Sequence, residues 1–179
     1  MKVRTNFVSN SSSSSFIVYF KEVPKSKEEL KTLLFGDRKE YHYPYGTEFF
    51  STNDVADIVW KDMQAGPADT EKVKNEVRSG YPVAPEWAVR NGLIKDMPSI
   101  SDYDTKPGTK FMDMFDRKAY EKALDEYYAQ FNGWINEEDI KKGKCYVFEY
   151  SDNDGTLRAA MEHGDLFENG VDAYRISKH

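Results

Sequence analysis

The run Phe16-Ile17-Val18-Tyr19-Phe20 decides the fold, because five consecutive β-branched or aromatic residues are typical of a β-strand. Five serines, Ser11–Ser15, come directly before it. Serine side chains are not apolar, and their hydroxyls compete for backbone hydrogen bonds, so the tract is not expected to build a core. The sequence therefore predicts a strand over residues 14–20, fed by a loop or a tag.

Two later segments have the same strand character. Residues 144–151 contain Cys145-Tyr146-Val147-Phe148, and residues 173–177 form a shorter and weaker run. Strands therefore lie near both ends of the chain.

The middle of the chain carries helical signals. Ser26, Ser51 and Asp69 are placed to cap helices, and residues 113–131 have the clearest helical spacing of apolar side chains. Helices between terminal strands indicate a single α+β domain over residues 1–179. We predict a small, mostly antiparallel sheet (strands near 14–20, 144–151 and 173–177) packed with four or five helices.

Composition narrows the classes of protein. The net charge is −6, with 39% hydrophobic and 31% charged residues, so a nucleic acid partner is not expected. Cys145 is the single cysteine, which excludes an intrachain disulfide and a multi-cysteine zinc site. No window approaches the roughly 18 apolar residues of a membrane span, and no apolar signal-peptide core is present. We expect a cytoplasmic protein.

The N-terminal block Phe7-Val8-Ser9-Asn10, followed by Ser11–Ser15 and Phe16, carries a resemblance. It resembles the FVSNSSSSSF motif that opens a group of small uncharacterised proteins, many of them encoded by bacteriophages. The resemblance covers about the first twenty residues well, and it implies a phage-type protein but no activity. We expect residues 1–13 to form a tag or an arm anchored by Phe7 and Val8, with Ser11–Ser14 accessible.

The segment 37–46 is predicted to be a binding loop, because it combines cations with aromatic rings. Such loops can stack nucleobases, but without a basic surround a protein partner fits better. The candidate binding residues are Tyr41, His42, Tyr43 and Tyr45, together with Ser11, Ser12 and Ser13 of the serine tract. We predict an accessory protein that binds a host or phage macromolecule through an acidic, aromatic-rich surface and needs no cofactor.

Two alternatives stay open. Carboxylates and imidazoles near the C-terminus could hold a divalent metal in a small hydrolase or nuclease. The candidate ligands are Asp152, Asp154, Glu162, His163 and His179. Turn and helix-end chemistry explains the same residues more simply, and no complete catalytic motif is present, so the sequence does not favour an enzyme. The second alternative is a minor virion or assembly component; oligomeric state is left open.

Overall fold

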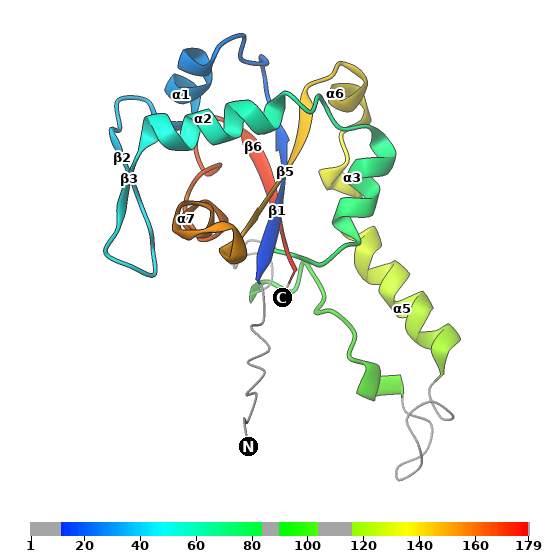
Figure 1. Ribbon diagram of the computed structural model, residues 1–179. Helices are drawn as coiled ribbons and strands as arrows, with labels where there is room; N and C mark the ends of the chain where they lie inside the picture. Colours follow the sequence, from blue (N-terminus) through cyan, green and yellow to red (C-terminus); the bar gives the residue numbers. More distant parts are fainter. Residues whose placement is uncertain (1–11, 84–89, 104–115, 179) are drawn as a thin grey trace, which may run out of the picture.

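The computed structural model describes residues 12–83, 90–103 and 116–178, and its centre is a four-stranded antiparallel sheet (Figure 1). The strand order is β4-β6-β1-β5. The strands are β1 (Ser13–Tyr19), β4 (Tyr81–Pro82), β5 (Cys145–Ser151) and β6 (Asp172–Ser177). The three segments predicted as strands thus share one sheet, and the predicted α+β class is confirmed.

Strand β1 lies inside the sheet because it has no polar face after its serines. Phe16 faces Phe148 of β5 on one side and Arg175 of β6 on the other. Every residue of β1 from Ser14 onward is buried. A strand buried on both faces has a continuous apolar run, which is what residues 16–20 provide.

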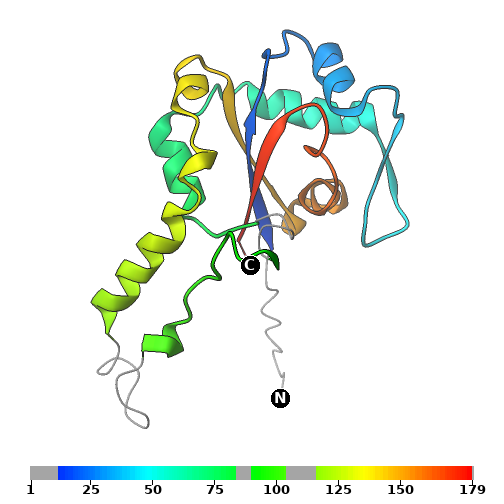
Figure 2. The same ribbon diagram turned by 180° about the vertical axis from the view of Figure 1, so that it is seen from behind.

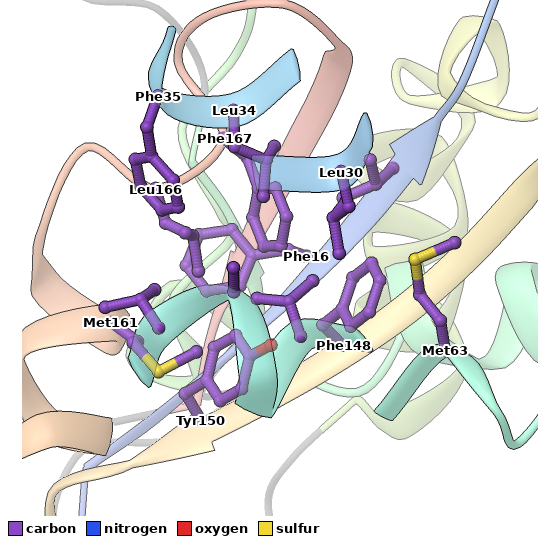
Figure 3. Packing of buried hydrophobic residues seen from close by; sticks show 14 of the residues in the cluster. Phe16, Leu30, Leu34, Phe35, Met63, Phe148, Tyr150, Met161, Leu166 and Phe167 are labelled. Carbon is purple, nitrogen blue, oxygen red and sulfur yellow. The ribbon is translucent and has the colours of Figure 1, made fainter. Parts of the chain in front are cut away.

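One face of the sheet carries the larger core. It is covered by α1 (Lys27–Phe35), α2 (Thr52–Met63) and α7 (Thr156–His163), and Figure 3 shows how their side chains meet. Phe16 and Val18 of β1 point into this core. The labelled members in Figure 3 are Phe16, Leu30, Leu34, Phe35, Met63, Phe148, Tyr150, Met161, Leu166 and Phe167.

The opposite face holds a second core around Ile17 and Tyr19. It is covered by α3 (Thr70–Val77), α5 (Arg117–Ala129) and α6 (Glu137–Lys141), which lie on the same side of the sheet in Figure 2. Two short 3-10 helices belong to this part of the chain, η1 (Ile100–Tyr103) and η2 (Asn132–Trp134). The Tyr19 hydroxyl donates to the Trp134 carbonyl at 2.8 Å, which joins β1 to η2.

The predicted helix starts are confirmed by their caps. Ser26, Ser51 and Asp69 accept hydrogen bonds from the first backbone N–H groups of α1, α2 and α3. The helix predicted over 113–131 is α5, which starts at Arg117 with Asp116 as its cap. Within the described residues, no helix combines the length and apolarity that crossing a membrane requires.

Helix α6 was not predicted, and of helix α7 only the end at Glu162-His163-Gly164 was expected, which the structure confirms. Helix α6 has only five residues, too few to show an apolar period. Helix α7 follows Gly155 and has no side-chain cap. The turn predicted over Asp152-Asn153-Asp154-Gly155 is the 3-10 helix η3 (Asp152–Asp154). Because these residues are typical of a turn, the sequence gives no separate signal for the start of α7 directly after them.

Part of the serine tract belongs to the sheet, which corrects the expectation that Ser11–Ser14 are accessible. Ser14 and Ser15 have 0% exposure, because β1 pairs with both neighbouring strands at these positions. The Ser14 hydroxyl accepts hydrogen bonds from Arg175 Nε and Nη2 at 3.2 and 3.1 Å. Strand pairing uses backbone groups, so a serine can extend a strand that neighbouring apolar residues have fixed.

The beginning of the described chain lies at the N-terminal end of the central strand β1. Ser12 Oγ donates to Asp152 Oδ2 at 3.1 Å, and Ser13 is the first residue of β1. The remaining residues discussed for the N-terminal arm lie outside the described residues: Phe7, Val8 and Ser11. Anchoring of the arm by its apolar pair therefore stays a prediction.

A polar cluster covers the sheet face opposite α7. Lys178 Nζ lies 2.7 Å from Glu76 Oε1 and 3.2 Å from Glu149 Oε1. Burial raises the pKa of the Glu76 carboxyl, but hydrogen bonding by Lys178, Ser15 and Ser79 outweighs burial and holds that pKa below its ordinary value. Glu76 and Lys178 thus form a partly buried ion pair between α3 and the end of β6.

Candidate functional site

A small aromatic hairpin stands beside the main sheet, next to α7 in both views (Figures 1 and 2). It consists of β2 (Glu40–His42) and β3 (Phe49–Ser51), which pair antiparallel. The turn is closed by a hydrogen bond from the Tyr43 N–H to the Glu48 carbonyl at 3.1 Å. The segment 37–46, which we predicted to be a loop, therefore contains a strand.

Tyr41 anchors the hairpin and is not a surface residue. Its side chain has 0% exposure, and its hydroxyl donates to the Ala160 carbonyl of α7 at 3.3 Å. Burial raises the pKa of the Tyr41 hydroxyl well above its ordinary value, so the group stays protonated. Of the four rings predicted to bind a partner, this one stabilises the fold instead.

The base of the hairpin is fixed by a second contact. Arg38 donates to both carboxylate oxygens of Asp165, at 2.7 and 3.4 Å. The Thr52 hydroxyl donates to the Arg38 carbonyl at 2.9 Å, which ties the start of α2 to the same point. The hairpin is therefore held at its base by polar contacts and along its inner face by Tyr41.

The tip of the hairpin reaches the end of α7. The Tyr45 and His163 rings meet edge to face, with centroids 5.0 Å apart, and Tyr43 packs against Tyr45 with centroids at 6.3 Å. Tyr45 belongs to the predicted binding loop and His163 to the predicted C-terminal cluster. The fold thus brings these two groups, which are distant in sequence, to one surface.

Two aromatic rings on the hairpin remain open to solvent. Tyr45 is 75% exposed and Phe49 is 61% exposed. His42 stands across from Phe49 in the strand register, and their ring centroids lie 4.9 Å apart. Since exposed rings held by a rigid element are typical anchors of protein interfaces, this surface is the strongest candidate site in the described chain.

A cleft of about 260 Å³ separates the hairpin from the segment after α7. We call it the hairpin cleft. Its lining residues are Arg38, His42, Pro44, His163, Gly164, Asp165 and Glu168. It contains two of the three histidines of the chain, an ion pair and one further carboxylate.

Glu162 directly precedes His163, which lines this cleft, but Glu162 itself is not a lining residue. It has 0% exposure, and neither carboxylate oxygen has a hydrogen-bond partner within the described part of the chain. Its Oε2 atom lies 3.6 Å from Nε2 of His163, which lines the cleft. Buried carboxylates are normally hydrogen-bonded, so a group in this state needs a physical explanation.

The other candidate metal ligands are not brought to this place. Asp152 and Asp154 lie in η3 before the first residue of α7, whereas His163 is the last residue of that helix. Eight helical residues separate these ends by about 12 Å, several times a metal–ligand distance. Among the residues that the structure describes, no group of three His, Cys, Asp or Glu side chains could hold a metal ion. His179 lies outside the described residues.

Sequence reasoning missed several residues of the surface. Phe49 was not recognised because the second strand of the hairpin has only three residues. A Pro and a Gly in the turn between two short aromatic runs were the available signal for a hairpin. Asp165 and Glu168 follow the end of α7, and nothing in the sequence placed them beside residues 38–45.

Comparisons with known proteins do not assign a family. No family model, no curated protein and no solved structure matches this chain.

Proposed function

We propose that this protein acts by binding another protein through the hairpin, with Tyr45 and Phe49 as the anchoring side chains. The observation that carries the proposal is their exposure, 75% and 61%, on a hairpin that is held at its base and along its inner face. A ring presented by a fixed element loses little conformational entropy on binding, so more of its burial energy contributes to affinity. Tyr is among the residues that most often dominate binding energy at interfaces.

The partner is a phage or host protein in the cytoplasm. This part of the proposal draws on the resemblance of the N-terminal block to phage-type proteins. It is consistent with the single cysteine, Cys145, which is a free and buried thiol. The activity is that of an accessory protein, which changes the behaviour of its partner by occupying a surface.

A photo-crosslinking experiment tests the proposal. A benzoylphenylalanine is placed at position 49 or, in a separate protein, at position 93. Leu93 is the control because it is 64% exposed and does not line the hairpin cleft. After irradiation in a lysate of the cell that makes the protein, we expect one dominant covalent adduct from position 49 and none of the same mass from position 93.

Competition makes the result quantitative. Unlabelled wild-type protein should suppress the adduct, and the Tyr45→Ala variant should suppress it at least about tenfold less well, which corresponds to the loss of one interface anchor. Equal competition by wild type and Tyr45→Ala would contradict the assignment of the hairpin. The absence of any adduct specific to position 49 would overturn the proposed function.

A further inference from the structure

The charges of the hairpin cleft are not balanced. Arg38 is the only cationic side chain that lines it apart from the two histidines, and it is already bound to Asp165 through both carboxylate oxygens. Glu168 is exposed, and no hydrogen bond or ion pair of its side chain occurs within the described residues. Two carboxylates lie at or near the cleft besides the Arg38–Asp165 ion pair. Glu168 lines the cleft, and Glu162 lies beside His163, which also lines it.

Glu162 is the decisive observation. A carboxylate taken out of water without a partner is destabilised by several kcal/mol unless a cation compensates it. The Nε2 atom of His163 lies 3.6 Å from Glu162 Oε2, which is longer than a normal hydrogen bond. The fold therefore leaves a buried acceptor without a hydrogen bond, next in sequence to a residue that lines a cleft open to solvent.

We infer that the hairpin cleft accepts a lysine or arginine side chain of the partner protein; this inference rests on the proposed function. At about 260 Å³ the cleft is smaller than the roughly 300–1,000 Å³ of ordinary small-molecule sites, so it suits a single side chain. Glu168 lies at the cleft to receive the cationic head, and Tyr45 offers an exposed ring beside it for a cation–π contact. Glu162 contributes long-range attraction from inside the protein, where screening by solvent is weak.

A small probe tests the chemistry without knowledge of the partner. The full chain, labelled with ¹⁵N, is titrated with Nα-acetyl-arginine N-methylamide, and the neutral citrulline analogue serves as the matched probe. We expect amide shift changes confined to residues 42–45 and 163–168 with the arginine probe only. Affinity should fall by about threefold or more between about 0.05 M and about 0.5 M salt, because an accessible charge contact is screened.

Three variants separate a binding role from a structural one. Glu168→Gln and Glu162→Gln should each weaken arginine binding by about threefold or more, as expected for removal of one charge partner. Glu71→Gln makes the same change of charge on α3, on the opposite face of the sheet, and should leave binding unchanged. Glu162→Gln should also keep or raise the melting temperature, because neither carboxylate oxygen of Glu162 makes a hydrogen bond that the substitution would remove.

The outcomes are distinguishable. Equal shifts with arginine and citrulline, or a Glu162→Gln protein that is destabilised and binds arginine as wild type does, would overturn this inference. If the position-49 adduct forms but the arginine probe does not bind, the hairpin remains an interface and only the cationic ligand is wrong. If the probe binds and no hairpin-dependent adduct exists, the proposed protein partner is wrong instead.

Discussion

The hydroxyl of Tyr41 occupies the space that a side chain at position 164 would need. A Cβ atom added to Gly164 would lie 2.2 Å from the Tyr41 oxygen and 2.7 Å from the Ala160 carbonyl oxygen. Since that carbonyl also accepts the Tyr41 hydrogen bond, the three groups form a single close contact between hairpin and helix. The position of the hairpin therefore depends on the absence of a side chain at position 164.

Replacing Gly164 with Ala should destabilise the protein. Tyr41 or the end of α7 must shift to admit the methyl group, and overpacking of this kind typically lowers the free energy of unfolding by about 1–3 kcal/mol. Chemical denaturation measures the effect. Gly133→Ala is the control, because a Cβ there meets no atom within 4 Å, and it should change stability by less than about 0.5 kcal/mol.

Two neighbouring serines should respond differently to the same substitution. Ser14 Oγ accepts two hydrogen bonds from Arg175, whereas Ser15 Oγ makes no hydrogen bond of normal geometry in the described residues and interacts only weakly with the Glu76 carboxylate. Ser14→Ala should lower the free energy of unfolding by about 1–2 kcal/mol, and Ser15→Ala should lower it by less. Equal destabilisation by both variants would contradict the observed pairing of these hydroxyls.

The strands and most helix starts were predictable because their signals are local. Residues 16–20 and 146–148 have β-forming side chains in unbroken runs, and Ser26 and Ser51 stand where a cap is needed. The burial of Ser14 was not predictable from serine itself. It results from pairing with strands that lie more than a hundred residues away in sequence.

The candidate site was predictable only in part. Tyr45 and His163 were both selected from sequence, but for separate sites, and nothing local shows that their rings meet. Tyr41 and Tyr45 have the same side chain and lie four residues apart, yet one is fully buried and the other 75% exposed. Burial of this kind is decided by tertiary packing, so sequence could nominate the segment but not the exposed rings.

Cys145 should be chemically inert while the protein is folded. Burial raises the pKa of its thiol to about 11, so near neutral pH almost none of the reactive thiolate is present. We expect Ellman's reagent to react at least about 100-fold more slowly with the native protein than with protein unfolded in guanidinium chloride, from thiolate fraction alone. Fast reaction of the native protein would show that this strand opens readily.

The ion pair between Glu76 and Lys178 should make stability depend on pH. The side chains of Glu76 and Lys178 are only 15% and 20% exposed. Lys178→Met therefore leaves a partly buried carboxylate without its cation. It should lower the free energy of unfolding by about 2–3 kcal/mol near pH 7. Because the pKa of Glu76 is lower in the folded protein than in the unfolded chain, its stabilisation is complete above the ordinary glutamate pKa of about 4.3 and is lost as the pH falls through the folded value.

The difference between wild type and Lys178→Met should therefore shrink between about pH 5 and about pH 3, as Glu76 becomes protonated in both proteins. Urea denaturation over this range measures it. Lys142→Met is the matched control, because it breaks the exposed i, i+4 pair between Lys142, at the end of α6, and Glu138, and it should leave the stability unchanged at any pH. A difference for Lys178→Met that stays constant down to the lowest pH would show that this lysine stabilises the sheet through packing of its methylenes and not through its charge.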